Sequence, residues 1–365
     1  MVARGPVRSG RPGRGGEPVT AREPVSGPVN GTVGGPLEAP ASRAAPVRVA
    51  AIDCGTNSLR LLIADVDPAS GELADVDRRM EIVRLGQGVD ATGRLAADAL
   101  ERTFRVLSEY ALAIEASSAH AVRMVATSAT RDAANADEFV RRVTGILGIA
   151  PEVLTGDQEA ALAFTGATAE LAHRNDGPAP PFLVTDIGGG STEFVIGAGA
   201  PAAGGQPTAI SVDIGCVRLT ERHLHSDPPL GAQITAATAD IDAALSVVAA
   251  KIPVTSARTL VGLAGSVTTV AAIALGLPRY DAARTHHAVI SASDVSAVTA
   301  DLLGRSRLDR ASISVLHPGR IDVIGAGALV LDRVLARFGF SDVLVSEHDI
   351  LDGIAWSVAG SGPPP

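Results

Sequence analysis

Lysine is almost absent from this chain, and its absence excludes one class of phosphate-binding site. Lys251 is the only lysine among 365 residues, so arginine supplies nearly all of the positive charge. A Walker-type phosphate loop needs a lysine directly after its glycines. The sequence therefore excludes that loop, and a phosphate site in this chain must be built from other groups.

Aromatic residues, cysteines and long apolar runs are scarce as well. Aromatic residues make up 3% of the chain and hydrophobic residues 46%, so the core must consist mainly of Ala, Val, Leu and Ile. Cys54 and Cys216 are the two cysteines, and their wide separation fits a reduced cytoplasmic protein better than a secreted one. No window approaches about 18 uninterrupted apolar residues, so we expect no membrane span. The net charge of −9 argues against a general nucleic-acid binder.

The first 45 residues differ from the rest of the chain in composition. They contain 7 Pro and 9 Gly, with six Arg against three Glu, and they show no signal-peptide pattern. A segment of this composition buries too little apolar surface to fold alone. We predict a disordered tail over residues 1–45; a tether for an acidic partner and a misassigned upstream start codon are the alternatives.

The stretch 182–196, FLVTDIGGGSTEFVI, places three glycines between two acids. It is typical of a strand, a tight turn and a second strand, with Asp186 and Glu193 at the two ends of the turn. Glycine allows positive φ, and successive N–H groups in such a turn form an anion-binding nest. Carboxylates beside a bound phosphate call for a divalent cation between them. The stretch therefore predicts a phosphate-and-metal site, with phosphate bound by Gly188, Gly189, Gly190 and Ser191.

A second stretch, 47–66, has the same pattern about 130 residues earlier. An apolar run ends at Asp53, a compact polar turn follows, and residues 59–66 are largely apolar again. Two such hairpins predict a duplicated architecture in which each half presents one phosphate loop to a shared cleft. The phosphate-binding candidates of this turn are Gly55, Thr56, Asn57 and Ser58.

Helical periodicity and histidine spacing give further expectations. Apolar residues recur at three and four positions over 94–116 and from Ile321 to Phe338, which predicts two helices. Gly325 and Gly327 inside the second helix cost about 1 kcal/mol each relative to Ala, so close backbone packing must compensate. His286 and His287 have no metal-ligand spacing around them, which favours a loop or core role.

Six stretches together resemble one known family. AIDCGTNSLRLLIADV and TDIGGGSTEFVIG resemble the first and second phosphate motifs of the acetate and sugar kinase, heat-shock chaperone and actin superfamily. Four others, ATSATRDAANADEF, LTGDQEAALAFTG, DIGCVRLTERH and VSEHDILDGI, are similar to its Ppx/GppA branch of exopolyphosphatases and guanosine pentaphosphate phosphatases. The resemblance covers about residues 47–357, as in short members without an HD-like C-terminal extension. It implies an α/β fold of two actin-like (ribonuclease H-like) domains with a central cleft.

The domain limits follow from the resemblance and from the linker-like sequence NDGPAPP at 175–181. We predict actin-like domain I over 46–175 and actin-like domain II over 182–347. A terminal helix over 348–358 would pack back on domain I, and residues 359–365 would fray.

The resemblance also implies roles for single residues. Glu159 matches the family's proposed general base, and Arg131 matches an arginine that faces the cleft, where its forked donors would clamp phosphate. Asp53, Asp186 and Glu193 would hold Mg²⁺ or Mn²⁺, and Asp186 counts as catalytic too. Considered alone, Arg131 is typical of a solvated helix entry and Glu159 of pairing with a helix dipole.

Two positions depart from the family pattern, and two helix starts add phosphate candidates. Relatives often carry glutamate where Gln158 stands and arginine where Leu351 stands, which puts a phosphate contact from position 351 in doubt. Arg218 lies at the start of a helix whose N–H groups would meet an anion, as do Gly265 and Ser266. Capping is the alternative role for Ser266. Cys54 and Cys216 are best explained as small buried hydrophobes.

The activity implied by the resemblance is hydrolysis of the terminal phosphoanhydride of inorganic polyphosphate, with Glu159 activating water and Mg²⁺ or Mn²⁺ assisting. The nearest alternative is hydrolysis of pppGpp to ppGpp at the same residues. An ATP-binding kinase or chaperone-like ATPase and an inactive polyphosphate or alarmone sensor are further alternatives. The family also implies a homodimer as the expected assembly.

Overall fold

The computed structural model describes residues 45–67, 72–169, 171, 177–199 and 207–360. The predicted tail over 1–45 and the frayed end lie almost wholly outside these ranges, as does the start of the predicted linker. None of the helices in the described ranges is long and apolar enough to cross a membrane. Both β-sheets described below belong to one compact unit.

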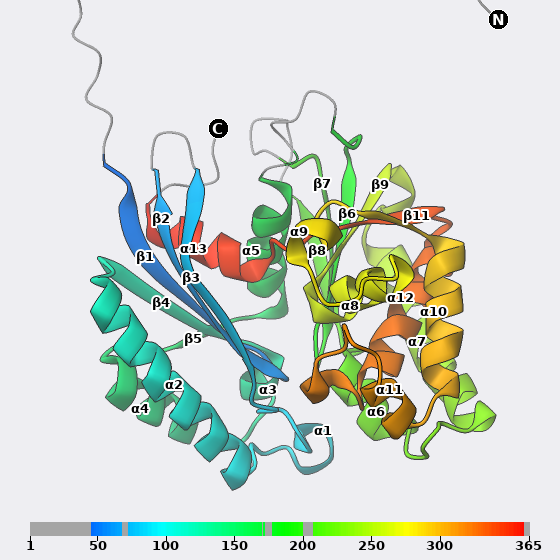
Figure 1. Cartoon of the computed structure of the whole chain (residues 1–365), viewed down its shortest axis with the longest axis horizontal. Coiled ribbons are helices and arrows are strands. Elements are labelled where there is room, and N and C mark those ends of the chain that lie inside the picture. Colours follow the sequence, from blue (N-terminus) through cyan, green and yellow to red (C-terminus); the bar gives the residue numbers. More distant parts are fainter. Residues whose placement is uncertain (1–44, 68–71, 170, 172–176, 200–206, 361–365) are drawn as a thin grey trace, which may run out of the picture. The chain divides into compact units, whose positions relative to one another are not determined.

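The first sheet has five strands in the order β3-β2-β1-β4-β5 (Figure 1). Strands β1, β2 and β3 pair antiparallel, whereas β4 and β5 add on in parallel. The strands are β1 (Val47–Cys54), β2 (Ser58–Val66), β3 (Leu73–Ile82), β4 (Ala121–Ala126) and β5 (Glu152–Val153). One face packs on α2 (Ala97–Ser117) and α4 (Ala136–Leu147), whose apolar side chains join those of β1 and β2 in one core. The helix predicted over 94–116 is thus confirmed as α2.

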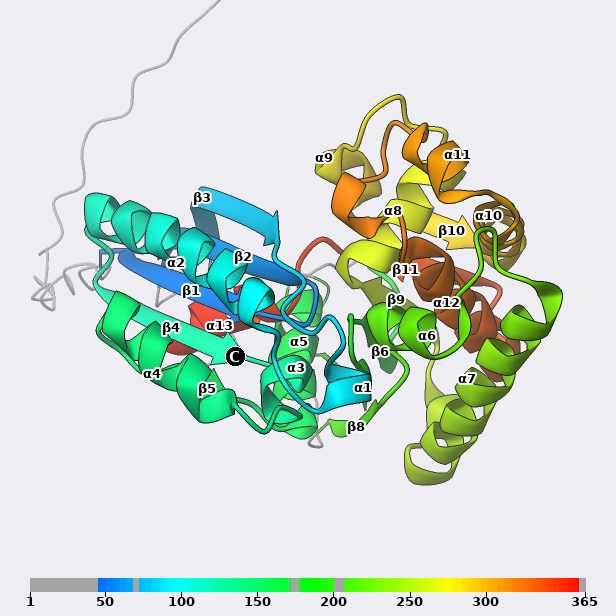
Figure 2. The ribbon, with the colours of Figure 1, turned by 90° about the horizontal axis from the view of Figure 1, so that it is seen from below.

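The second sheet has six strands in the order β10-β11-β9-β6-β7-β8. Figure 2 labels β6, β8, β9, β10 and β11 of this sheet. Here β6, β7 and β8 pair antiparallel, and β9 and β11 add on in parallel, so the first sheet's pattern recurs. The strands are β6 (Phe182–Ile187), β7 (Thr192–Gly197), β8 (Thr208–Val212), β9 (Thr259–Leu263), β10 (Val289–Ser291) and β11 (Asp342–Val345). The predicted α/β class and the duplicated architecture are confirmed. The exact domain limits stay a prediction.

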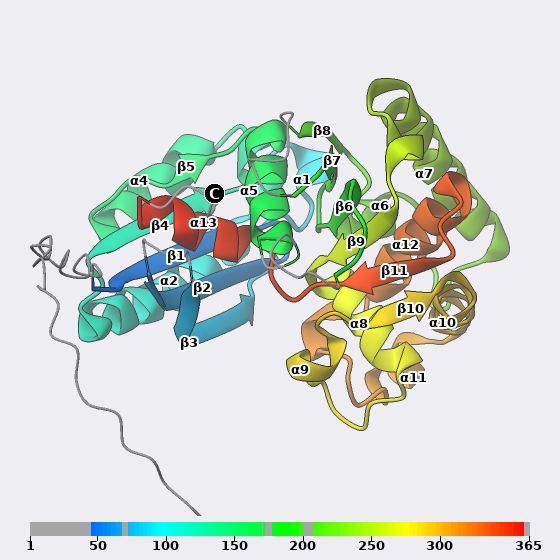
Figure 3. The same ribbon diagram turned by 90° about the horizontal axis from the view of Figure 1, so that it is seen from above.

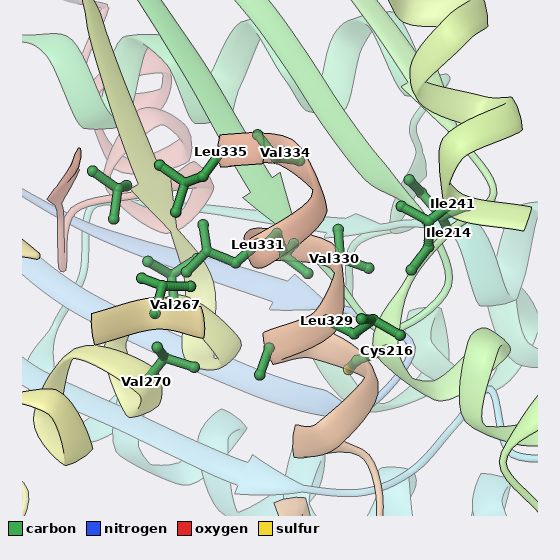
Figure 4. Packing of buried hydrophobic residues seen from close by; sticks show 14 of the residues in the cluster. Ile214, Cys216, Ile241, Val267, Val270, Leu329, Val330, Leu331, Val334 and Leu335 are labelled. Carbon is green, nitrogen blue, oxygen red and sulfur yellow. The ribbon is translucent and has the colours of Figure 1, made fainter. Parts of the chain in front are cut away.

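Helices rich in Ala, Val and Leu cover one face of the second sheet. Figure 4 shows residues of α12 between residues of α7 and α8, together with Ile214 and Cys216. These helices are α6 (Cys216–His223), α7 (Gly231–Lys251), α8 (Ala264–Ala274), α10 (Ala292–Gly304) and α12 (Ile324–Phe338). The predicted helix from Ile321 begins three residues later. Close packing compensates Gly327, because a Cβ there would lie 2.7 Å from the Cβ of Ser266.

Two helices, α5 (Gly156–Thr168) and α13 (Ile350–Val358), share one core with both sheets (Figure 3). Helix α13 contacts β1, β2 and β4, and α5 contacts β6, β7 and β8. The helices cross at Gly166 and Gly353. A Cβ at Gly166 would overlap the carbonyl oxygen of Asp349, and a Cβ at Gly353 would overlap that of Leu162. These two glycines therefore set the close approach of the helices.

Several short elements have no counterpart among the predicted ones. They are α1 (Val89–Thr92), α3 (Ser128–Arg131), α9 (Ala282–Thr285), α11 (Arg307–Ala311) and the 3-10 turns at Val254–Ser256 and Pro318–Arg320. Such elements hold too few residues for a periodic pattern to show. Helix α10 was also missed, although Val295, Val298 and Leu302 are buried along one face.

We expect Gly166→Ala to destabilise the fold by about 3 kcal/mol, because the new methyl group overlaps backbone that cannot move freely. Chemical denaturation followed by circular dichroism measures the change. Gly145→Ala in α4 is the matched control: its Cβ would enter open space. That substitution should stabilise by about 0.5–1 kcal/mol through helix propensity. Equal effects of the two substitutions would contradict the crossing described above.

Candidate active site

One cavity brings together residues from both predicted hairpins. It lies between the β1–β2 turn, the β6–β7 turn and the first residues of α5 and α8. Most sequence-predicted residues line it: Asp53, Gly55, Thr56, Asn57, Ser58, Glu159, Asp186, Gly188, Gly189, Ser191, Gly265 and Ser266. Arg131, Glu193, Gly190 and Arg218 are absent from its wall. Arg60, Thr127, Ser128 and Arg320 line it without having been predicted.

The two turns have the same hydrogen-bond geometry. The Gly55 N–H donates to the Ser58 carbonyl at 3.0 Å, and the Gly188 N–H donates to the Ser191 carbonyl at 3.1 Å. Within the described ranges, no backbone carbonyl accepts the next N–H groups, those of Thr56 and Gly189. These N–H groups on two facing turns are available to an anion, and the phosphate-binding role predicted for each turn stays a prediction.

The glycines serve close approach and not positive φ, which corrects the expectation from sequence. None of the three glycines 188–190 has positive φ. A Cβ on Gly189 would instead lie 2.9 Å from the Cβ of Thr56, and one on Gly190 would lie 2.6 Å from the Ser128 Oγ. Glycine is needed here because the two turns touch.

Four carboxylates are buried around the cavity. Asp53 lies opposite Arg60 in the β1–β2 ladder, and Asp186 lies opposite Glu193 in the β6–β7 ladder. Burial raises the pKa of Asp186 well above the usual carboxyl range, and the charge of Glu193 raises it further. Burial also raises the pKa values of Asp53 and Glu193. The Ser211 Oγ donates to the Glu193 carboxylate at 2.7 Å, behind the cavity wall.

Glu159 points into the cavity from the first turn of α5. A capping box fixes this turn, because Thr155 and Gln158 exchange hydrogen bonds at 2.9 and 3.3 Å. Gln158 therefore does what a glutamate would do at that position. Burial raises the pKa of Glu159 well above its usual range, and Glu193 is the next largest cause.

Arg131 contacts the candidate base and lies outside the cavity wall. Its Nη1 donates to the Leu154 carbonyl at 2.8 Å and to the Glu159 Oε2 at 3.3 Å. The guanidinium is thus placed to orient Glu159 and to favour its charged form. A direct phosphate contact, as implied by the resemblance, stays a prediction.

Arg60 is held between two buried aspartates. Its Nε and Nη2 donate to the Asp53 Oδ2 at 3.0 and 2.7 Å, and its Nη1 donates to the Asp349 Oδ2. Asp349 also caps α13 by accepting the Leu351 N–H at 2.9 Å. Arg60 therefore ties the first hairpin to the C-terminal helix. Pairing of the predicted hairpin sets Arg60 opposite Asp53, and this register is the signal that could have found it in the sequence.

Arg320 differs from Arg60 because it makes no ion pair with a described acid. Its Nη1 reaches only the Gly265 carbonyl at 3.4 Å and the Thr269 Oγ1 at 3.5 Å. Burial lowers its pKa, so the surroundings favour an added negative charge. It lies in a three-residue 3-10 turn, which gave no signal in the sequence.

The start of α6 does not offer its N–H groups to an anion, contrary to the expectation. The N–H groups of Cys216 and Val217 donate to the carbonyls of Gly188 and Gly189 at 2.9 and 2.8 Å. Arg218 is also engaged: its Nε donates to the Gly190 carbonyl at 2.7 Å, and it pairs with Asp90 and Asp132. Helix α6 thus supports the glycine turn from behind.

The start of α8 does face the cavity. Leu263 occupies its N-cap position without a side-chain hydrogen bond, so capping by Ser266 is not observed. Ala264, Gly265 and Ser266 line the cavity. Ala264 has φ of 66°, a conformation that is uncommon for a residue with a Cβ. An uncapped helix start beside a cavity suits a phosphate.

The two cysteines are buried, and three of the histidines pack against one another. Cys54 and Cys216 are buried and form no disulfide, and burial raises the pKa of each thiol. The rings of His286 and His287 stack at 3.7 Å, and that of His348 lies 4.7 Å from His286. Within the described ranges, no three His, Cys, Asp or Glu side chains are arranged to hold a metal alone.

The cavity fits a divalent cation shared with a ligand. The Asp53 Oδ1 is buried without a hydrogen-bond partner in the structure, and Asp186 and Glu159 line the same space. Carboxylates this buried are stabilised by a cation. Since Mg²⁺ typically keeps waters and substrate oxygens beside one or two carboxylates, a complete protein cage is not required.

Comparison with known proteins agrees with this geometry. The model of the Ppx/GppA phosphatase family matches residues 62–361. The chain belongs to this family. Exopolyphosphatase 2 of Mycobacterium tuberculosis is 49% identical over 324 residues, covering 86% of this chain and 99% of that protein. The crystal structure of an exopolyphosphatase-like protein is 44% identical with a TM-score of 0.79, covering 84% and 97% of the two chains. An Aquifex aeolicus family member is 33% identical with a TM-score of 0.70, covering 85% and 97%.

In this Ppx/GppA family member, the structure accounts for the leucine at position 351, where relatives often carry arginine. Leu351 is 1% exposed and belongs to the core shared by α5, α13 and both sheets. A leucine there completes apolar packing, and its side chain offers no donor to a phosphate.

We expect Mg²⁺ to raise the melting temperature, and more so at higher pH. Four carboxyls with raised pKa values stabilise the fold below about pH 4, the unfolded value, and this contribution is lost as pH rises through their folded pKa values. A cation favours the charged forms and reverses that loss. Differential scanning fluorimetry from pH 5 to 8 measures it. Asp186→Asn should shrink the Mg²⁺ effect, whereas the exposed control Asp157→Asn should not. A shift independent of pH would contradict this account.

Proposed function

We propose that this chain is an exopolyphosphatase that hydrolyses the terminal phosphoanhydride of inorganic polyphosphate and releases orthophosphate. The observation that carries the proposal is the convergence of two N–H-bearing turns and three carboxylates on one cavity. Donors for a phosphoryl group and a buried base occur there together. The names of the Mycobacterium tuberculosis relative and of the exopolyphosphatase-like structure support the same substrate.

The proposed chemistry is in-line displacement by water. The terminal phosphoryl group binds the N–H groups of both turns, and Glu159 accepts a proton from the attacking water. The water oxygen bonds to the terminal phosphorus as its bond to the bridging oxygen breaks, and the shortened chain leaves as an oxyanion. When bound by Asp53 and Asp186, Mg²⁺ or Mn²⁺ supplies charge neutralisation. Catalysis of this kind rests mainly on positioning and electrostatics.

Glu159 must be charged to accept a proton, and Arg131 serves that purpose. Burial and three neighbouring carboxylates raise the pKa of Glu159, whereas the Arg131 charge lowers it. The hydrogen bond at 3.3 Å also fixes the carboxylate's orientation. We therefore propose that Arg131 positions the base and that activity rises with pH through the folded pKa of Glu159.

A second candidate substrate, pppGpp, is favoured by one observation. A cavity of about 460 Å³ adjoins the first one and shares Arg60, Ala264, Gly265 and Arg320 with it. Its wall includes Tyr280, Val315 and Leu316, aromatic and apolar side chains that suit a nucleoside. The terminal anhydride of pppGpp would reach the same inner site.

We expect Glu159→Gln to lower kcat for polyphosphate by about 10²–10⁴, because the amide cannot accept the proton. Phosphate release from tripolyphosphate, long polyphosphate, pppGpp and ATP with Mg²⁺ measures both activity and substrate class. Asp157→Asn changes an exposed acid in the same first turn of α5 and should retain wild-type rates. Release mainly from pppGpp would favour the second candidate, and release from ATP alone would overturn both.

We expect Arg320→Ala to raise KM for tripolyphosphate about tenfold or more, since it removes an arginine that no described acid pairs with. Arg320→Lys should recover part of the loss by restoring the charge. Arg337→Ala removes the same charge from the exposed end of α12 and should change KM little. An unchanged KM in Arg320→Ala would show that the substrate does not reach this position.

A further inference from the structure

The inner cavity is open on one side and closed on the other. On the open side it continues into the adjoining cavity of about 460 Å³, past Arg60 and Arg320. Beyond the two turns, a separate pocket lined by Thr56, Gly190 and Arg218 has a volume of only about 10 Å³. That volume holds about one water molecule and cannot admit a phosphate chain.

The closed side is a wall made by side chains of one sheet against backbone of the other. The Thr56 Oγ1 and Ser128 Oγ form a buried hydrogen bond of 2.9 Å. Gly189 and Gly190 press on this pair so closely that a Cβ on either would meet it at 2.9 Å or less. Behind Thr56, a Cβ on Gly86 would overlap its methyl group. The wall therefore leaves no gap between the turns.

Arg218 holds the two sides of this wall together through three hydrogen bonds. Its Nε donates to the Gly190 carbonyl at 2.7 Å, its Nη1 to Asp90 at 2.7 Å and its Nη2 to Asp132 at 2.5 Å. Gly190 belongs to the β6–β7 turn of the second sheet, whereas Asp90 and Asp132 lie in the connections that follow β3 and β4 of the first sheet. Beside it, the Glu221 carboxylate accepts the Gly88 N–H at 3.0 Å. One side chain, 12% exposed, thus joins both halves at the closed side.

We propose that this wall makes the cavity a dead end that admits only the terminus of a phosphate chain, and that Arg218 is the specificity-determining residue that keeps it closed. The proposal rests on the proposed function. An internal phosphoryl group carries chain on both sides, so it could reach Glu159 only if chain passed through the wall. A terminal phosphoryl group needs room on the open side alone. Discrimination thus arises from exclusion and not from a contact to the terminus.

The test compares three chains of equal length: tripolyphosphate, tripolyphosphate with a methyl ester at one end, and tripolyphosphate with methyl esters at both ends. With the wild-type protein and Mg²⁺, ³¹P NMR follows all products. We expect the one-end ester to react within a fewfold of the free chain, because one terminus remains. The two-end ester should react at least 100-fold more slowly. Similar rates for the two-end ester would overturn the dead end and leave phosphoanhydride hydrolysis standing.

Substitutions test whether Arg218 is the residue that excludes the two-end ester. In Arg218→Ala we expect the rate ratio of two-end ester to free chain to rise at least tenfold, with internal cleavage of long polyphosphate seen on gels. Arg222→Ala is the matched control, because Arg222 is on the same helix and pairs with the same Asp90 but does not reach Gly190. Its ratio should stay at the wild-type value. Asp132→Asn weakens one ion pair of Arg218 at an exposed position and should shift the ratio in the same direction. A ratio unchanged in both Arg218→Ala and Asp132→Asn would overturn the assignment.

A binding measurement tests the dead end even if the protein hydrolyses none of the three chains. Should no chain be hydrolysed, the proposed function falls, and isothermal titration of the wild-type protein then compares the chains directly. We expect the two-end ester to bind at least tenfold more weakly than the one-end ester. Equal binding of these two would overturn the dead end independently of catalysis.

Discussion

The structure depends on the burial of four carboxylates where two β-hairpins meet. Asp53, Asp186, Glu193 and Glu159 are each 9% exposed or less, and like charges at such sites destabilise one another. Arg60 and Arg131 relieve part of this cost, one beside Asp53 and one beside Glu159. Asp186 and Glu193 have no such arginine in the described part of the chain. The remaining negative charge is what the proposed divalent cation would neutralise, and only with that cation in place would an anionic phosphate be favoured beside these carboxylates.

One difference between the duplicated halves bears on the charge of the cavity. Opposite the first acid of each hairpin stands Arg60 in the first sheet and Glu193 in the second. The first half is thereby neutralised internally, and its arginine extends to Asp349 at the start of α13. The second half stays acidic. An equivalent backbone thus positions an aspartate paired with arginine on one side of the cavity and two facing carboxylates on the other.

The sequence predicted this fold and most of the cavity because the determining signals are local. Each hairpin carries an apolar run, an acid and a glycine-containing turn within about 20 residues, and pairing then brings Asp53, Asp186 and both turns together. The role of Arg218, by contrast, could not be predicted from local sequence signals. Its partners Asp90 and Asp132 lie 128 and 86 residues away, so its role depends on tertiary contacts. The same holds for Arg320, whose short turn has no periodic pattern. The Gly188–Gly190 turn lies between two strands as predicted, but its glycines are needed for close approach and not for positive φ.

This close approach connects packing with chemistry. Since glycines 189 and 190 do not need positive φ, an alanine at either would strain the contact with Thr56 and Ser128 and not the local backbone. The halves would have to separate, and the N–H groups of the two turns could then no longer bind the same phosphoryl group, as proposed above. The width of the cavity is therefore set by the missing Cβ atoms of one turn. The proposed phosphate binding and the proposed closure of the wall thus depend on the same glycines, and Arg218 binds the Gly190 carbonyl behind them.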